Sequence, residues 1–307
     1  MLRIAHLSDS HILSPTAVDW RKILFNKRIT GYTNLVLRRG RVYRREHLLA
    51  VLEAAAACAD HVVVTGDITN LGLESEYDEA RRLINSVAGR TEVTVVPGNH
   101  DIYLASVQRE RRFPQYFGTW LVSDLPEYAV QLPVGPYPCV KLRGPAAIIA
   151  LSSAVPRPPF VSSGDVGDVQ LAALEKILTH PEVVRRTPVI LLHHPPVDQR
   201  IRLAQLRDGL VDAASLRSAL APLSRGLVLF GHLHVRMRCK LLTPTGALDV
   251  VCASGAALDH PNVEIRAGFN LYEIDNQGAI ASVHAHVVDP ADGALRAMSI
   301  AERMNCA

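Results

Sequence analysis

The chain has 307 residues, of which 48% are hydrophobic and 21% charged, and a formal net charge of +3. This is the composition of a soluble globular protein, and no apolar run approaches the roughly 18–20 residues that would span a bilayer, which excludes a helical membrane protein. The length suffices for a sizeable core in one large domain or two average ones. Because no repeat, low-complexity segment or linker interrupts the sequence, we expect a single domain over residues 1–307.

The basic residues are concentrated in one short stretch. Residues 21–45 hold nine lysines and arginines and no acidic residue, so removing these nine from the total of +3 leaves the rest of the chain at −6. Aromatic residues are interleaved with them in a basic insert at about residues 12–45. Such a segment is either a solvated face or a surface that attracts an anionic substrate or an anionic membrane. No known nucleic-acid-binding pattern accompanies it, so nucleic acid is not the expected partner.

The cysteines and the N-terminus indicate the cellular compartment in which the protein is expected. The five cysteines are odd in number and lack CxxC spacing; they are Cys58, Cys139, Cys239, Cys252 and Cys306. This argues against a disulfide framework and a cysteine zinc site, and it suits a reducing compartment. The sequence begins directly in a strand pattern, without the basic region that opens a signal peptide. We therefore expect a cytoplasmic protein, with peripheral attachment to a membrane as the alternative.

The first third of the chain alternates between strands and helices. Short β-branched runs end in turn residues, as buried parallel strands do, and the segments between them carry apolar faces at helical spacing. The expected order is strand 2–7, helix 46–59, strand 61–65, helix 74–87 and strand 92–96. This alternation predicts a parallel sheet with right-handed crossovers.

The pattern weakens in a proline-rich insert at about residues 113–145, which we expect to be an irregular excursion over the surface, and then resumes. The expected elements are strand 146–151, helix 169–179, strand 188–192, a short helix from Asp212 as its N-cap to Leu220, and strand 227–230. From residue 248 onward the sequence alternates as strands, with a hairpin turn at 275–278.

Polar side chains follow directly after five of these strands. They are Asp9 and His11, then Asp67, then Asn99, His100 and Asp101, then His193, and finally His232 and His234. Ligands bind beyond the carboxyl ends of strands in open α/β sheets, so these groups are expected to meet at one edge.

Seven of these side chains are oxygen or imidazole donors, namely Asp9, His11, Asp67, Asn99, His193, His232 and His234. A set without thiolates suits divalent or trivalent first-row ions such as Mn, Fe, Zn or Co. The number exceeds the three or four protein ligands of a mononuclear catalytic site. It is enough for two metal ions if one carboxylate bridges them. Two such ions, about 3.5–4 Å apart, clamp a phosphoryl group and activate water.

The same residues resemble the pattern of a known family. Asp9-x-His11, Gly66-Asp67, Gly98-Asn99-His100-Asp101, His193 and Gly231-His232-x-His234 follow the order D-x-H, G-D, G-N-H-(D/E), H and G-H-x-H of the calcineurin-like metallophosphoesterases. The motifs span positions 9 to 234. The resemblance implies a four-layer αββα sandwich, in which two mixed β-sheets are flanked by helices.

The resemblance also implies a role for each residue. Asp9, His11 and His234 would hold one metal ion, Asn99, His193 and His232 the other, and Asp67 would bridge both. His100 would stay off the metals and either protonate the leaving alkoxide or stabilise its charge, with Asp101 orienting it. His193 is preferred to His194 as the ligand because the family has His-x-Pro there and Pro195 fits that spacing. His194 would lie behind the ligands or face the substrate.

Within the family, the chain is similar to bacterial phosphodiesterases that act on cyclic nucleotides or glycerophosphodiesters. The similarity lies in the loop at residues 66–70, the His-His-Pro-Pro run at 193–196 and residues 164–178. The basic and proline-rich inserts depart from it where the family varies in substrate choice.

We therefore expect a dinuclear hydrolase of phosphoesters, with phosphodiesters favoured, that uses attack by metal-bound water or hydroxide and forms no covalent enzyme intermediate. Its partner would be a small phosphoester substrate, and a homo-oligomer is left open. One alternative is a membrane-surface hydrolase of a lipid-linked pyrophosphate that uses residues 21–45. Another is an inactive metal-binding scaffold, although such a protein is expected to lack a ligand and none is missing here.

Overall fold

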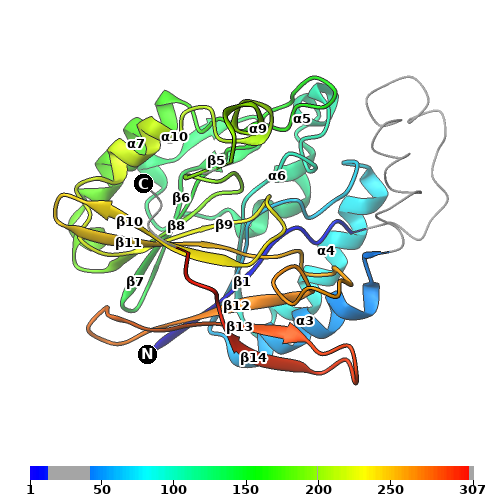
Figure 1. Ribbon diagram of the computed structural model, residues 1–307. Coiled ribbons are helices and arrows are strands. Elements are labelled where there is room, and N and C mark those ends of the chain that lie inside the picture. The colour runs from blue at the N-terminus through cyan, green and yellow to red at the C-terminus, as the bar shows by residue number, and fades with distance from the viewer. Residues whose placement is uncertain (13–41, 199, 304–307) are drawn as a thin grey trace.

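The structure is a computed structural model, and it describes residues 1–12, 42–198 and 200–303. Two six-stranded β-sheets lie face to face, and helices cover their outer sides (Figure 1). This is the expected αββα sandwich of two mixed sheets, so the predicted fold class is confirmed. Most of the basic insert, including residues 21–41, lies outside the described residues.

The first sheet contains strands from both ends of the chain. Its strands in chain order are β1 (Leu2–Leu7), β2 (His61–Val64), β3 (Glu92–Val95), β12 (Gly268–Ile274), β13 (Ile280–Val288) and β14 (Leu295–Ser299). Their order across the sheet is β14-β13-β12-β1-β2-β3. Strands β1, β2 and β3 are parallel, as predicted, whereas β12 runs antiparallel to β1.

The second sheet is built from the middle of the chain. Its strands are β6 (Cys139–Arg143), β7 (Ala146–Ala150), β8 (Thr187–Leu191), β9 (Leu227–Phe230), β10 (Met237–Thr243) and β11 (Gly246–Cys252). They are ordered β10-β11-β9-β8-β7-β6, and β7, β8 and β9 are parallel. Strands β4 (Val130–Leu132) and β5 (Gly135–Tyr137) form a separate two-stranded ribbon.

Helices α3 (Arg45–Cys58) and α4 (Glu74–Ala88) pack on the first sheet, and α7 (Asp168–Leu178) and α10 (Ala213–Leu220) cover the second (Figure 1). Shorter helices complete the connections: α5 (Ala105–Arg109), α6 (Arg112–Phe117), α8 (Pro181–Val184), α9 (Arg202–Asp208) and the 3₁₀ turns Gly118–Trp120 and Pro126–Tyr128. None of the helices in the described part of the chain is long and apolar enough to cross a membrane.

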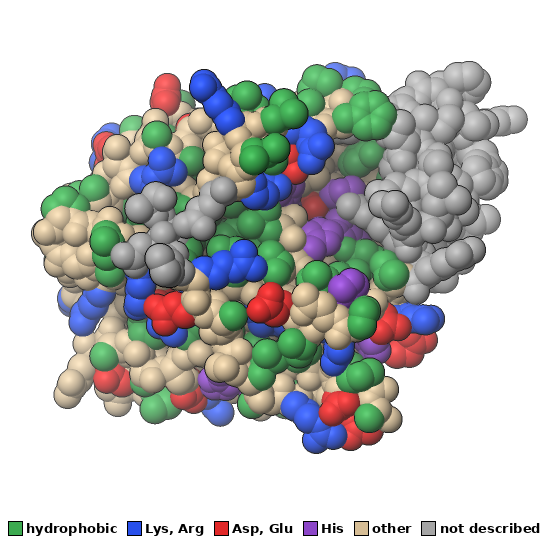
Figure 2. Space-filling model, in the orientation of Figure 1, with side chains coloured by type: hydrophobic (Ala, Val, Ile, Leu, Met, Phe, Trp, Pro, Cys, Tyr) green, Lys and Arg blue, Asp and Glu red, His purple; other side chains and the backbone are tan. Residues whose placement is uncertain are grey.

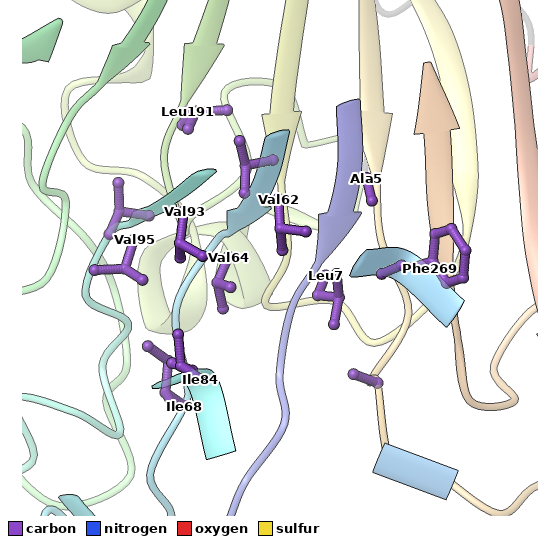
Figure 3. Close-up of a cluster of buried hydrophobic side chains, with 14 of the residues drawn as sticks. Ala5, Leu7, Val62, Val64, Ile68, Ile84, Val93, Val95, Leu191 and Phe269 are labelled. Carbon is purple, nitrogen blue, oxygen red and sulfur yellow. The ribbon is translucent and has the colours of Figure 1, made fainter. Parts of the chain in front are cut away.

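Two hydrophobic clusters form because the central strands carry apolar side chains on both faces. In β8, Leu191 faces the cluster shared by the two sheets, whereas its neighbour Ile190 belongs to the cluster under α7 and α10. Figure 3 shows Leu191 in the same cluster as Val62 and Val95 of the first sheet. Full burial of one such side chain contributes about 1.5–3 kcal/mol, so the two clusters hold the sheets face to face.

The proline-rich insert is more regular than expected. Residues 139–143 form β6, the edge strand of the second sheet, and Phe113 and Phe117 of the segment before it are fully buried. The expectation of an irregular surface excursion is therefore wrong for these parts. Pro138 lies just before β6 and Pro145 lies in the turn between β6 and β7, so neither costs a ladder hydrogen bond.

The side chain of Asp212 does not act as the expected helix cap. Helix α10 does begin directly after it, but its carboxylate accepts hydrogen bonds from the amides of Val166 and Gly167. Asp212 therefore joins α10 to the loop before α7. That pairing links positions 45 or 46 residues apart, so local sequence could not indicate it.

The cysteines differ from the expectation at one position. Cys58, Cys139 and Cys252 are free thiols, whereas Cys239 is disulfide-bonded. The odd count and the spacing argue against a disulfide framework and suit a reducing compartment, and the disulfide at Cys239 departs from the reduced state that such a compartment favours. Pairing depends on proximity in the fold, which sequence spacing does not reveal.

Candidate metal centre

The ends of five parallel strands meet at one edge of the sandwich, and backbone hydrogen bonds hold them there. In the first sheet, the Asp9 amide donates to the Gly66 carbonyl at 3.0 Å. In the second, the Gly231 amide donates to the His193 carbonyl at 3.1 Å. The His232 amide donates to the Asp9 carboxylate at 3.0 Å and so links the two sheets. Figure 2 shows histidine side chains gathered around a hollow with an acidic side chain among them.

Five of the candidate ligands have backbone conformations that L-residues rarely adopt. The angle φ lies between +42° and +65° at Asp9, His11, Asp67, His232 and His234. Each such position costs about 1–3 kcal/mol and persists only where the surrounding structure holds it, typically at functional sites. This strain is independent support for a site at this edge.

The glycines of the motifs are needed for close packing. A Cβ atom on Gly98 would collide with Asp67, and one on Gly231 would collide with Ser8 and Asp9. The Gly-Asn and Gly-His pairs therefore allow neighbouring loops to approach until their polar side chains meet.

The first group of donors contains Asp9, His11, His234 and Asp67. The Nε2 atom of His234 lies 3.0 Å from Asp9 Oδ1 and 3.3 Å from His11 Nε2. His11 Nε2 is also 3.9 Å from Asp67 Oδ2. One ligand atom from each of the four residues lies within 4.8 Å of the others.

The second group contains His193, His232, Asn99 and again Asp67. His193 Nε2 lies 3.2 Å from both Asn99 Oδ1 and His232 Nδ1, and 3.4 Å from Asp67 Oδ2. The other oxygen of Asp67, Oδ1, accepts a hydrogen bond from the His100 amide at 2.7 Å. Asp67 therefore presents one oxygen, Oδ2, to both groups, and the structure brings all seven predicted ligands together.

The residues fit a cation. Asp9 Oδ1 is buried, and its contact with His234 Nε2 at 3.0 Å lacks the geometry of a hydrogen bond. Burial lowers the pKa of His193, but the carboxylates of Asp67 and Asp9 outweigh it and raise the pKa to about 9. The field of the two carboxylates thus favours a positive charge at this point, which a metal ion bound by neutral imidazoles would supply.

Neighbouring oxygens fix which imidazole nitrogen faces the centre. His193 donates from Nδ1 to the Thr65 carbonyl at 2.6 Å, which leaves the Nε2 lone pair free. The hydroxyl of Tyr43 lies 3.0 Å from His234 Nδ1 and helps to hold the orientation of that ring. Sequence reasoning missed Tyr43 because it belongs to the basic insert and to no motif.

His194 lies among the histidines but has no lone pair to offer. Its Nε2 is 2.9 Å from the Ser162 carbonyl, which can only accept, so Nε2 carries the proton. Its Nδ1 then accepts from the Ser153 hydroxyl at 2.8 Å. Although the three rings of His193, His194 and His232 lie together, both nitrogens of His194 are engaged. This favours His193 as the ligand.

The His100 ring is oriented by the Asn70 carbonyl and not, as expected, by the Asp101 side chain. His100 Nδ1 lies 2.5 Å from the carbonyl of Asn70, which orients the ring. The Asp101 carboxylate instead accepts from the amides of Ile68, Thr69 and Gly98 and from the Thr69 hydroxyl. Burial and the nearby Asp67 raise the pKa of Asp101 to about 7. Asp101 therefore ties two ligand loops together and orients His100 only through the backbone.

Comparison with known proteins points to the same family that the motifs indicate. The family model described as calcineurin-like phosphoesterase matches residues 2–236. A probable cyclic nucleotide phosphodiesterase from Rhodococcus erythropolis is 29% identical over 272 residues, which cover 81% of this chain and 79% of that protein. A cAMP/cGMP dual specificity phosphodiesterase from Mycobacterium tuberculosis is 26% identical over 233 residues, which cover 75% of this chain and 61% of that protein.

Among solved structures, a purple acid phosphatase from yellow lupin superposes with a TM-score of 0.62 at 11% identity, over 99% of this chain and 54% of that one. The chain thus spans about half of the lupin chain and about three fifths of the mycobacterial relative. At this identity the superposition supports the fold alone. Because the family model covers most of the chain, from the first strand to the loop beyond His234, the protein belongs to the calcineurin-like phosphoesterase family and is a phosphoesterase.

Proposed function

We propose that this protein is a dinuclear metal-dependent phosphodiesterase. The observation that carries the proposal is the position of Asp67 Oδ2, which lies 3.4 Å from His193 Nε2 in one donor group and 3.9 Å from His11 Nε2 in the other. A single oxygen facing two groups of imidazole and carboxylate donors is the arrangement that a bridging ligand requires.

In this proposal Asp9, His11 and His234 hold one ion, and Asn99, His193 and His232 hold the other. The donor set suits Mn, Fe, Zn or Co. Two bound ions would activate a water molecule and neutralise the charge of the phosphoryl oxygens. The chain itself orients the ligand imidazoles, through the Thr65 carbonyl at His193 and the Tyr43 hydroxyl at His234.

His100 is the residue placed to act on the leaving group. It is half-buried, and its Nδ1 contacts the Asn70 carbonyl at 2.5 Å, which sets the orientation of the ring. In this proposal Nε2 is the nitrogen that acts on the substrate. A proton on Nε2 can be given to the departing alkoxide or can stabilise its charge. Asp101 supports this by holding the Asp67 and Asn99 loops at a fixed distance.

The preference for diesters is supported by the two relatives, both of which carry phosphodiesterase descriptions. We test it with Mn²⁺-loaded protein and four substrates: an activated diester, the matching activated monoester, a cyclic nucleotide and a glycerophosphodiester. We expect kcat/KM to be at least about ten-fold higher for the activated diester than for the monoester. Equal values, or a higher value for the monoester, would contradict the diester assignment.

A further inference from the structure

Arg236 is a buried cation that follows His234 by two residues in the chain, and only 2% of it is exposed. Its guanidinium donates to Asn270 Oδ1 at 3.2 Å, to Ser254 Oγ at 2.5 Å, and to the carbonyls of Val263 and Arg266 at 2.9 and 3.1 Å. Among the described residues, all of these partners are neutral. Burying a charge without a counter-charge costs several kcal/mol, so an apolar side chain would fill this space at lower cost. The hydrogen bonds must therefore contribute something that packing alone would not.

The loop between β9 and β10 requires such an anchor because it carries two strained ligands. The angle φ is +65° at His232 and +54° at His234, and each such position costs about 1–3 kcal/mol. On its N-terminal side, the loop is held by the hydrogen bond from the His232 amide to Asp9. On its C-terminal side, the Arg236 amide donates to the Glu264 carbonyl at 2.7 Å, and the guanidinium adds its four hydrogen bonds. Hydrogen bonds of a charged group contribute about 1.5–3 kcal/mol each, which is enough to offset the strain.

The segment at residues 254–266 accepts most of these hydrogen bonds and is itself joined to the first donor group. Near its start, the Ala256 amide donates to the Ser8 carbonyl at 2.9 Å. Ser8 directly precedes Asp9, a member of that group. Arg236 therefore acts on the backbone beside Asp9 as well as on the loop between β9 and β10.

The same segment also places Tyr43 beside His234. Leu258 forms an antiparallel β-bridge with Tyr43, whose hydroxyl lies 3.0 Å from His234 Nδ1. In the second donor group, by contrast, His193 is held by the Thr65 carbonyl at 2.6 Å. The contacts that depend on Arg236 are thus concentrated on the first group.

We propose that Arg236 is a positioning residue that holds His234 and its surroundings in the geometry that the first ion needs, a proposal that rests on the dinuclear function proposed above. The planar guanidinium fixes several acceptors at once in a rigid fork, whereas the single ammonium of lysine cannot reproduce that geometry. Keeping the positive charge is therefore not sufficient, and Arg236→Lys should lose the effect.

The test is stepwise Mn²⁺ binding to chelator-treated protein, measured by calorimetry for wild type, Arg236→Lys and Ser254→Ala. Ser254→Ala removes one acceptor and leaves the cation in place. We expect Arg236→Lys to bind the ion of the first group about 10–100-fold more weakly and the other ion as wild type does. Ser254→Ala should change the same affinity in the same direction by less. The ion lost in His234→Ala identifies the first group, and kcat for a diester at saturating Mn²⁺ should match wild type.

Arg238→Lys is the matched control, because Arg238 lies two residues further along, in β10, and pairs with the Asp249 carboxylate at 2.7 Å. It should leave both affinities unchanged. The proposal is overturned if Arg236→Lys and Ser254→Ala bind both ions as wild type does, or weaken both equally, as a general loss of stability would. If Arg236→Lys does not fold, Ser254→Ala decides by the same criterion. Failure of the proposed function differs, since wild-type protein would then bind fewer than two ions or leave an activated diester intact.

Discussion

In the proposed centre Asp67 would serve two ions, because its two oxygens face different partners. Oδ1 is occupied by the His100 amide, whereas Oδ2 faces imidazoles from both sheets. The same division applies to Asp9, whose Oδ2 accepts from the His232 amide while Oδ1 faces His234. Each carboxylate is thus fixed by a backbone amide on one side and open to a cation on the other.

The proposed roles of Asn99 and His100 can be separated by mutation. Asn99→Ala removes an oxygen donor of the second group, so we expect loss of one of two bound ions and of diester turnover. His100→Ala removes no donor, so both ions should stay bound while kcat falls by about 10²–10⁴-fold. Metal analysis and diester kinetics distinguish the two variants, with Gln277→Ala in the exposed hairpin turn as the control. Loss of an ion from His100→Ala would show that His100 is a ligand.

Tyr43 is expected to support the first ion through His234. Tyr43→Phe keeps the ring that packs edge-on against His11 at 5.0 Å but removes the hydroxyl beside His234 Nδ1. Groups that orient a metal-bound histidine are typically worth about 10–100-fold in metal affinity. We expect a loss of that size for one of two Mn²⁺ ions, measured by calorimetric titration, and none for Tyr128→Phe. Unchanged affinity for both ions would exclude this role.

Motif residues could be predicted from sequence because each has a fixed spacing from a strand end. All seven predicted donors come together for that reason. The supporting contacts could not be predicted in the same way. Asn70 contacts the His100 ring through a backbone carbonyl, which carries no residue signal, and Tyr43 contacts a residue 191 positions away.

The proline-rich insert packs against a helix that positions one of the loops of the site. Phe117 of α6 packs against Tyr77 of α4, with ring centroids 5.5 Å apart. The Tyr77 hydroxyl in turn donates to the Asp101 carbonyl at 2.6 Å. A segment that sequence alone presented as an irregular excursion is thus linked by packing to the loop that carries Asn99 and His100.

Phe117→Ala should therefore be strongly destabilising. Its side chain is fully buried, and truncating a buried phenylalanine costs about 3–5 kcal/mol because a cavity remains. The free energy of unfolding in urea measures this, with Val122→Ala as the control because Val122 is 62% exposed. A loss below about 1 kcal/mol for Phe117→Ala would show that this segment is not integral to the core.

Whether a strand could be predicted depended on how clearly its local sequence marks its two ends. Strands β1 and β9 have the predicted bounds because each ends at a clear change in the sequence: β9 is an apolar run between two glycines, and β1 ends where Ser8 and Asp9 begin. Strand β6 was missed because prolines surround it, and β10 because it alternates polar and apolar residues at an edge of the sheet. Edge strands are half exposed and lack the continuous apolar run that marks a central strand.

At the scale of the whole molecule, buried histidines make stability depend on pH. His61 of β2 is fully buried, and its Nε2 lies 2.9 Å from the Thr94 hydroxyl. Burial lowers its pKa from 6.5 to about 4. The unfolded chain therefore gains a proton below pH 6.5 that the folded chain accepts only near pH 4, so stability is retained above pH 6.5 and lost as the pH falls.

We predict that His61→Gln reduces this loss. Between pH 7 and pH 5 the buried neutral imidazole accounts for about 2 kcal/mol of the fall in unfolding free energy, which glutamine, lacking a titration in this range, would not show. Urea unfolding of chelator-treated protein at both pH values measures the difference without a contribution from metal release. An identical fall in wild type and variant would contradict the assignment to His61.

The two sheets each contribute ligands to both donor groups, so the proposed centre forms only when the whole sandwich is folded. The first group combines Asp9 and His11 with His234, and the second combines Asn99 with His193 and His232. We propose that two ions, both held by Asp67, are required for hydrolysis of a phosphodiester.

The most direct test is a Mn²⁺ titration of chelator-treated protein in which bound metal and hydrolysis of an activated phosphodiester are followed together. We expect two bound equivalents per chain, activity that reaches its plateau only with the second, and a spin-coupled pair in the electron paramagnetic resonance spectrum. Full activity with a single bound equivalent, or two ions without magnetic coupling, would contradict it.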